Sequence, residues 1–241
     1  MPYAWLNLVK ADGATILIER ADDGSAKDSI GSNDFTYSSP VFPGVSLMGN
    51  AILPSMKLPA TEQASATHTT DFDLVNPTTI EFFWQTGDVF SEGWFIFGSG
   101  PVFATNGLTF VVATIILQGV LSSTMTINSH EASTNWATAT DGNQSPAYLP
   151  QHVVCVFNAT GDGWTVYWNG VVAVEQFDSG NSGSNIANPV IGAAGNSTEM
   201  NFGPFVIYKG VELTAIQARN HYNAAFGLTD RSRDAARDYR R

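Results

Sequence analysis

The sequence is poor in charged residues and has no long apolar run. Charged residues make up 14% of its 241 positions, well below the roughly 25% usual in soluble domains. Only 11 residues are Lys or Arg, and the formal net charge is −11. This balance argues against general nucleic-acid binding, because neutralising phosphates requires clustered basic side chains. Membrane insertion is not expected either, since no apolar run approaches the roughly 18 residues that would span a bilayer.

Cysteine is almost absent as well. Cys155 stands alone, so no internal disulfide can form. Its apolar neighbours in the run 153–157 predict that it is a small buried hydrophobic residue. The first seven residues lack both a basic start and an apolar stretch, so we expect no secretory signal.

What the chain does contain is typical of an all-β protein. Hydrophobic residues make up 44% of it, enough for a large core. β-Branched and aromatic residues predict strands at 78–84, 151–157, 164–168, 171–177 and 202–208. One or two further strands are predicted over 108–121, with a break near Gln118-Gly119. Asn169-Gly170 is a typical hairpin turn. One helix is predicted at 215–226, with Thr214 as its N-cap and Gly227 at its end.

Long polar segments at 55–71, 128–147 and 178–201 are predicted to be loops. Many short strands with turn signals and one late helix indicate a two-sheet antiparallel sandwich. The predicted fold class is therefore all-β, with one short C-terminal helix.

Several segments also resemble landmarks of one superfamily, and they occur in its order. They are 22–31, 49–54, 79–84, the hairpin formed by 152–157 and 166–170, and finally 205–208 with 213–217 and Tyr222. In this pattern the chain resembles the laminin-G-like, concanavalin A-like jelly-roll superfamily. The resemblance implies a jelly-roll domain over residues 1–227, followed by an Arg-rich tail over 228–241. It also implies a structural role for His152.

The resemblance does not by itself imply a function, since hydrolases, lectins and virion proteins share this fold. Hydrolases of the superfamily carry a Glu-x-Asp-x-x-Glu strand, because hydrolysis needs two carboxyl groups about 5–9.5 Å apart. The nearest match here begins at Asp71 and Asp73 but ends in the amide of Asn76, which cannot act as an acid. We therefore predict that the chain is not an enzyme.

No metal or cofactor is predicted either. The four histidines show no metal-ligand spacing. Asp141, Asn143 and Asp162 offer oxygen ligands for calcium, but no Asp-x-Asp-x-Asp-Gly loop accompanies them.

Glycan binding needs an aromatic ring for the sugar's C–H face, with amides or carboxylates for its hydroxyl groups. The segment 128–148 offers both kinds of group in a polar context. The candidates are Asn135, Trp136, Asp141, Asn143 and Tyr148. The same two aromatic residues could instead pin a long loop to the sandwich, and the sequence leaves both interpretations open.

The last eleven residues form the most basic segment of the chain. Their five arginines are Arg231, Arg233, Arg237, Arg240 and Arg241. The segment is either a solvated terminus or a basic arm that docks on an acidic neighbour.

Two hypotheses for function follow. The first is a virion structural protein of a bacteriophage, either a capsid decoration protein or a tail-associated one, with other virion proteins or copies of itself as partners. It rests on a sandwich made without disulfide or signal, the low charge and the basic tail. The second is a carbohydrate-binding, lectin-like adhesion module at a cell surface or on a tail fibre. The first hypothesis implies a location on the surface of the virus particle, and the second implies an extracellular or cell-surface location.

Overall fold

A computed structural model describes residues 4–228 with several gaps. The gaps are residues 22, 38–41, 45, 49–54, 59–62, 74, 76, 87–91, 94–97, 100–106, 118–119, 132, 141–148, 161–162, 177–187 and 193–199. Between residues 92 and 140 it describes the backbone alone.

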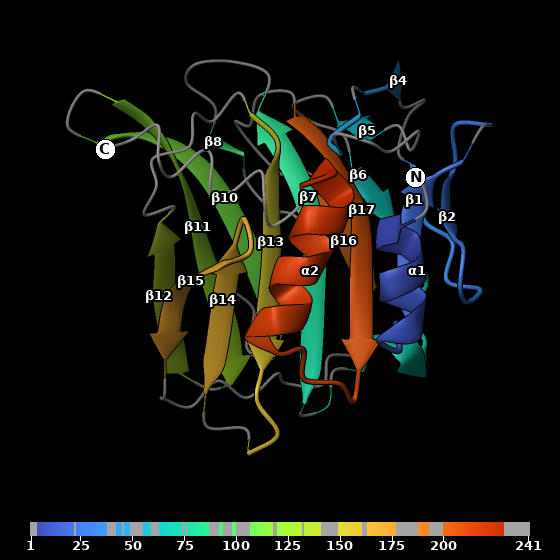
Figure 1. Cartoon of the computed structure of the whole chain (residues 1–241). Coiled ribbons are helices and arrows are strands. Elements are labelled where there is room, and N and C mark those ends of the chain that lie inside the picture. Colours follow the sequence, from blue (N-terminus) through green and yellow to red (C-terminus); the bar gives the residue numbers. More distant parts are fainter. Residues whose placement is uncertain are drawn as a thin grey trace.

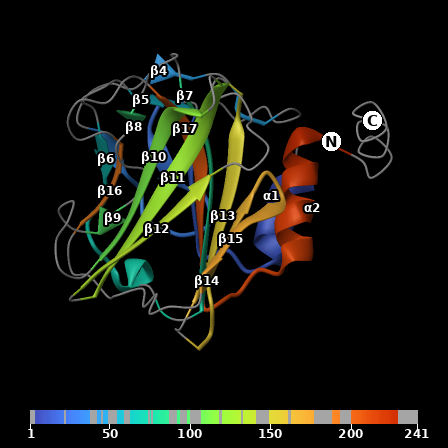
Figure 2. The same cartoon turned by 90° about the vertical axis from the view of Figure 1, so that its left-hand side faces the viewer.

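Two antiparallel sheets form a sandwich (Figure 1; Figure 2 shows the two layers edge on). The strands of the first sheet are β1 Ile16–Arg20, β2 Ala26–Asp28, β4 Phe42–Pro43, β5 Met56–Leu58, β7 Thr78–Thr86, β13 Gln151–Phe157, β14 Trp164–Trp168, β15 Val171–Gln176 and β17 Met200–Lys209. Their order is β15-β14-β13-β7-β17-β1-β2, with β5 pairing β17 and β4 pairing β5.

The second sheet lies behind the first and contains the longest hairpin. Its strands are β3 Thr36–Tyr37, β6 Gln63–Ser65, β8 Glu92–Gly93, β9 Gly98–Ser99, β10 Gly107–Leu117, β11 Val120–Glu131, β12 Ser133–Thr140 and β16 Pro189–Gly192. Their order is β12-β11-β10-β9-β16-β6-β3, with β8 also pairing β10. Among the described residues, no strand pairs with the outer side of β15 or of β12, so each forms an edge of its sheet.

Side chains of β7 alternate between two apolar cores, as a strand with both faces covered requires. Ile80, Phe82 and Trp84 point into the core between the sheets. Phe83 points the other way, into a second core under the helices. Both cores are closed to solvent, since each of these side chains is fully buried. The middle of the first sheet is thus covered on both faces.

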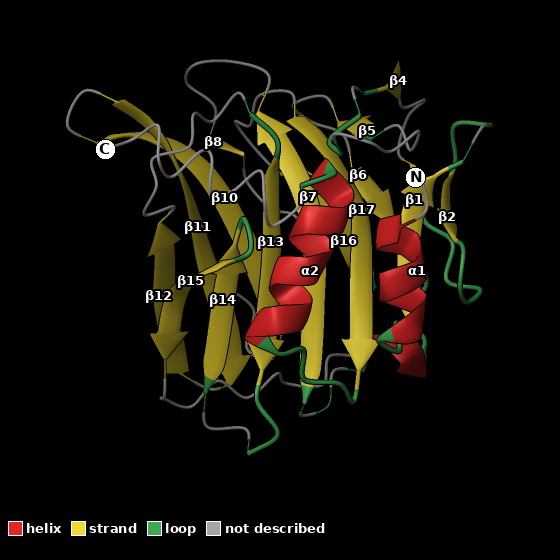
Figure 3. Ribbon diagram, in the orientation of Figure 1, coloured by secondary structure: helices red, strands yellow, loops and turns green. Residues whose placement is uncertain are grey.

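Two helices cover the outer face of the first sheet (Figure 3). The helix α1, Ala4–Ala11, buries Trp5 and Val9, which are four residues apart and so share one side of the helix. The helix α2, Ala215–Phe226, begins with a capping box between Thr214 and Gln217. It ends at Gly227, whose left-handed backbone closes the last turn. No helix among the described residues has the length and hydropathy needed to cross a membrane.

The two-sheet antiparallel sandwich with a helix after its last strand is confirmed. The predicted break in the segment 108–121 is confirmed too, because β10 ends at Leu117 and β11 begins at Val120, with which it pairs. The helix α1 is an addition that the sequence did not predict. The expectation of a loop over 128–147 was wrong as far as Thr140, because β11 and β12 pair along residues 124–140. Threonine-rich strands can be polar and still pair well.

Candidate functional site

The structure places two of the predicted glycan-binding residues on a strand. Asn135 and Trp136 belong to β12, where they pair with Ser129 and Asn128 of β11. The other three candidates, Asp141, Asn143 and Tyr148, lie outside the described residues, in the connection from β12 to β13. The arginines at 231, 233, 237, 240 and 241 also lie outside them. Asn135 and Trp136 therefore occupy this edge of the second sheet.

The edges formed by β12 and β15 meet on one side of the sandwich. There β12 contacts β15 (Figures 1 and 2). Two successive valines of β15 are notably exposed, Val171 at 42% and Val172 at 44%. Leu149, which precedes β13, is 45% exposed. We call β12, β15 and Leu149 the binding edge.

A buried amide holds the hairpin turn at the binding edge in place. Gln151 Oε1 accepts hydrogen bonds from Trp168 Nε1 at 2.8 Å and from Asn169 Nδ2 at 2.9 Å. Gln151 Nε2 donates to the carbonyl oxygen of Leu149 at 2.9 Å. Asn169 and Gly170 have φ values of 50° and 73°, as the turn between β14 and β15 requires. Leu149 and the exposed valines are thus fixed at the same end of the first sheet.

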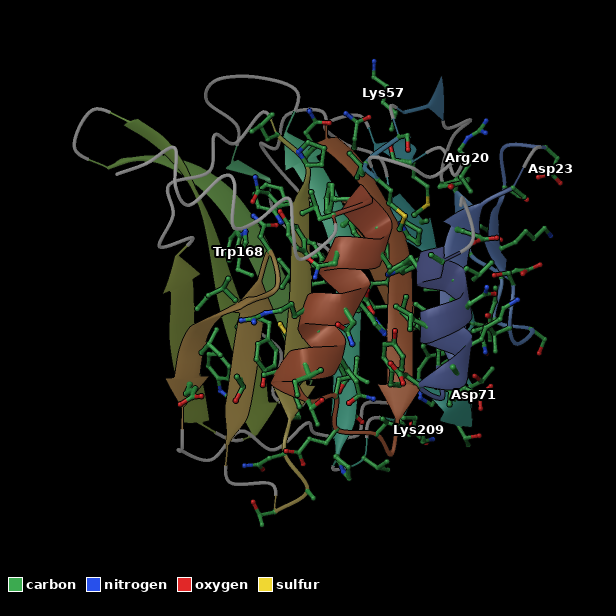
Figure 4. The ribbon with its side chains drawn as sticks, viewed as in Figure 1. Arg20, Asp23, Lys57, Asp71, Trp168 and Lys209 are labelled. Atoms are coloured by element: carbon green, nitrogen blue, oxygen red, sulfur yellow. The ribbon has the colours of Figure 1, made fainter. Side chains whose placement is uncertain are left out.

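Aromatic side chains lie directly behind this turn. The rings of Trp168 and Trp84 meet edge to face with centroids 6.2 Å apart (Trp168 is labelled in Figure 4). Both are buried, so they support the turn and do not themselves form an exposed platform. An edge with a rigid turn and exposed apolar side chains suits the apolar faces of a sugar ring.

A group of hydrogen-bonded polar side chains is buried under the helices. Glu81, at the centre of β7, accepts four hydrogen bonds from four different elements. On Oε1 the donors are Trp5 Nε1 at 2.7 Å and His152 Nε2 at 2.8 Å. On Oε2 they are Tyr208 OH at 2.6 Å and His221 Nδ1 at 2.8 Å. We call these five residues, together with Asp12, the Glu81 cluster.

In the Glu81 cluster, the imidazole of His221 lies between the carboxylates of Glu81 and Asp12. His221 Nε2 lies 2.8 Å from Asp12 Oδ2, so this imidazole bridges two carboxylates. Both of its nitrogens face carboxylate oxygens, which makes a doubly protonated cation the form that fits. His152 has only one such contact, because its Nδ1 is buried without a hydrogen-bond partner among the described residues. His152 is therefore neutral, with its proton on Nε2.

The pKa values follow from these contacts. Burial alone would raise the pKa of Glu81, but the charge of His221 and the hydrogen bonds from both histidines outweigh it and hold that pKa far below its ordinary value. Burial lowers the pKa of His152, against the opposing hydrogen bond to Glu81. For His221 the attraction of Glu81 and Asp12 exceeds the effect of burial and raises the pKa to about 9.

The Glu81 cluster is not a site for substrate. The side chains of Glu81, His152 and His221 have no exposed surface, and only Asp12 is partly exposed. Its donors come from α1, β13, β17 and α2, so the cluster fixes both helices to the sheet. The structural role predicted for His152 is consistent with this position. The sequence did not identify His221 or Asp12 as members, because neither has a local motif.

The aspartates that resembled a hydrolase strand are engaged in other contacts. Asp71 lies in a short 3-10 helix, Thr70–Phe72, and accepts a hydrogen bond from Asn33 Nδ2 at 3.1 Å. Asp73 lies 2.9 Å from His68 Nε2. The same Asn33 amide donates to Asp28 Oδ2 at 3.0 Å, so this amide joins Asp71 to Asp28. The described residues contain no group of three or more His, Cys, Asp or Glu arranged to hold a metal ion.

The sequence itself shows no significant similarity to known proteins. No protein-family model matches it, and no curated protein is significantly similar to it. Comparison of the structures gives clear similarities. The binding domain of Paraclostridial Mosquitocidal Protein 1 superimposes with a TM-score of 0.68 at 11% identity, over 88% of this chain and 52% of that chain. The chain thus shares the β-sandwich fold of that domain.

Two further structures resemble the chain. The binding domain of botulinum neurotoxin DC, in complex with SialylT, gives a TM-score of 0.66 at 14% identity, over 89% of this chain and 52% of that one. Domain 4 of AbnA, a GH43 extracellular arabinanase from Geobacillus stearothermophilus, is in complex with arabinotriose. It gives a TM-score of 0.60 at 14% identity, over 87% of this chain and 98% of that domain.

The three matched proteins differ in how much of their own length this chain covers. The chain spans about half the length of the two toxin binding domains but nearly the whole arabinanase domain. At identities of 11–14% these similarities show the fold alone. They are similarities to binding domains, and they lend no support to the virion hypothesis.

Proposed function

We propose that this chain is a non-catalytic carbohydrate-binding module that uses the binding edge. The observation that carries the proposal is the near-complete correspondence with an arabinanase domain in complex with arabinotriose. The second hypothesis from the sequence, a lectin-like adhesion module, is thus favoured over the virion structural protein. An extracellular or cell-surface location goes with it, because the arabinanase is extracellular.

The chemistry of the binding edge supports this function. Trp136 on β12 is proposed as the aromatic platform and Asn135 as a hydrogen-bonding partner for hydroxyl groups. Val171 and Val172 add exposed apolar surface on the opposite edge strand. Because β12 contacts β15, one oligosaccharide could reach both strands. Asp141, Asn143 and Tyr148 stay candidates in the connection that follows β12.

The proposal is tested by calorimetric titration with arabinotriose and by a broad glycan array. We expect Trp136→Ala to weaken binding about fivefold, since a ring stacked on a sugar contributes about 1 kcal/mol. Val172→Ala should weaken binding by a smaller factor. Val75→Ala is the matched control, because Val75 is equally exposed at 43% but precedes β7. Absence of any glycan ligand, or full affinity in both edge variants, would contradict the proposal.

The Arg-rich tail remains a separate proposal. Its five arginines would let it dock on an acidic surface of a neighbouring protein. Removing residues 229–241 should leave glycan binding unchanged while weakening attachment to such a partner. Loss of glycan binding in the truncated chain would show that the tail belongs to the sugar site.

A further inference from the structure

We propose that the Glu81 cluster is an acid-sensitive contact that holds α2 against the first sheet and loosens when His152 takes up a second proton. The cluster lies under the helices, on the outer face of the sheet, and shares no residue with the binding edge. The inference therefore does not rest on the carbohydrate-binding proposal.

The contacts of His152 make it the residue of the Glu81 cluster that is most sensitive to acid. Its Nε2 donates to Glu81, and its ring stacks on Phe83 with centroids 4.6 Å apart. Tyr222 of α2 lies over the other side, with a centroid distance of 6.0 Å. A proton added to Nδ1 would find no acceptor among the described residues. It would place a charge between an apolar ring of the sheet and a ring of the helix.

The charged neighbours of His152 decide the direction of the effect. Glu81 of β7 favours the cationic imidazole, while His221 of α2, which is already a cation, disfavours it. Asp12, which follows α1, and Tyr208 of β17 reach His152 only through these two residues. Burial is the largest effect, and the pKa of His152 is lowered as a result. Stability from His152 is complete above the ordinary value of 6.5 and is lost as the pH falls below it.

His221 acts in the opposite sense and limits the size of the response. Its pKa is raised to about 9, so its contribution to docking is greatest in acid. Opening of α2 between pH 7 and pH 5 is favoured by His152 and disfavoured by His221. An imidazole of ordinary pKa 6.5 that stays neutral while α2 is docked favours opening over this range by at most roughly 25-fold, and His221 opposes it by about fourfold. The expected net increase in opening is therefore at most about sixfold.

The consequence is exposure of a specific apolar surface. On its inner side α2 buries Ala218 and Ala225, which pack in the same core as Phe83 and Val154. Loosening the helix would uncover these side chains while the core between the sheets stays closed. The sandwich would thus present a new apolar face in acid without unfolding.

Hydrogen exchange followed by mass spectrometry tests the inference on the full chain. After correction for the intrinsic rate, exchange in α2 should rise several-fold from pH 7 to pH 5, while exchange in β7 and β13 stays constant. His152→Gln keeps an amide donor near Glu81 but cannot titrate, so its α2 should show no rise. His68→Gln is the matched control and should respond as the wild type does, because His68 lies outside the Glu81 cluster.

Three results would overturn the inference. They are a constant exchange rate in α2 of the wild type, an equal rise in α2 and β7, and a rise that persists in His152→Gln. If that variant does not fold, NMR titration of the wild-type histidines replaces it. A midpoint for His152 below 6.5 then supports the contact, and a midpoint at or above 6.5 overturns it.

Discussion

Glu81 Oε2 and His221 Nδ1 lie 2.8 Å apart although 140 residues separate them in the sequence. This contact joins the middle of the first sheet to the helix that follows its last strand. Neither side chain has exposed surface, so the pair interacts without the screening that weakens ion pairs at a surface. The stability of the helix-covered face should therefore depend strongly on these two residues.

Glu81→Gln should lower the free energy of unfolding by about 3–5 kcal/mol, because it leaves the buried cation of His221 with only one carboxylate partner. Urea denaturation at pH 7 measures the change. Glu175→Gln is the matched control, since Glu175 is an exposed carboxylate on β15, and its cost should stay within about 0.5 kcal/mol. Equal costs for the two variants would show that the Glu81 cluster adds nothing to stability.

Because the pKa of His221 is raised, we expect the protein to lose stability in alkaline solution. Its pKa is raised to about 9 from an ordinary value of 6.5, so the folded state holds the proton more tightly than the unfolded state. The resulting stability is complete below pH 6.5 and is lost as the pH rises through 9. Its full size is on the order of 3 kcal/mol. Urea denaturation at several pH values between 6 and 9.5 should show this decline.

His221→Gln should remove most of the alkaline decline and lower the stability at pH 6.5. His68→Gln, which alters a pair outside the Glu81 cluster, should keep it. A decline of the same size in His221→Gln would assign the pH dependence to other groups.

The sequence predicted the elements that have local signals and missed those that depend on distant contacts. Thr214 and Gly227 bound α2 as predicted, because caps and left-handed glycines are local features. The helix α1 was missed because eight residues carry a weak helical pattern and its Trp5 is fixed by Glu81, 76 residues away.

The same difference applies to the candidate sites. Trp136 was assigned to a loop but lies on β12, since this polar strand is stabilised by pairing with β11 and not by its own pattern. His152 and the segment 79–84, which contains Glu81, were noted as landmarks of the superfamily that the chain resembles. Their partnership with His221 and Asp12 depends on chain segments up to 209 residues apart, and no spacing rule predicts such a contact.

Cys155 should not react with thiol reagents in the folded protein. It is fully buried in the core between the sheets, and burial raises the pKa of its thiol well above the ordinary value. Labelling with a maleimide at pH 7.5 should be undetectable over an hour and complete in 6 M guanidinium chloride. Fast labelling of the native chain would mean that the sandwich opens frequently or that β13 is not in the core.

The turn between β14 and β15 offers a last test, because two glycines differ there in a useful way. Gly170 and Gly210 both have positive φ values, 73° and 77°, so alanine strains the backbone at either position by about 1 kcal/mol. A Cβ atom at Gly210 would meet nothing within 4 Å, whereas one at Gly170 would lie 3.1 Å from Tyr222 Cβ and 3.3 Å from Arg219 Cα. Gly170→Ala should therefore cost more stability than Gly210→Ala, measured by urea denaturation. It should also weaken glycan binding, since Val171 and Val172 follow the displaced turn directly, while Gly210→Ala should bind as the wild type does. Equal stability and equal binding of the two variants would show that contact with α2 does not fix the binding edge.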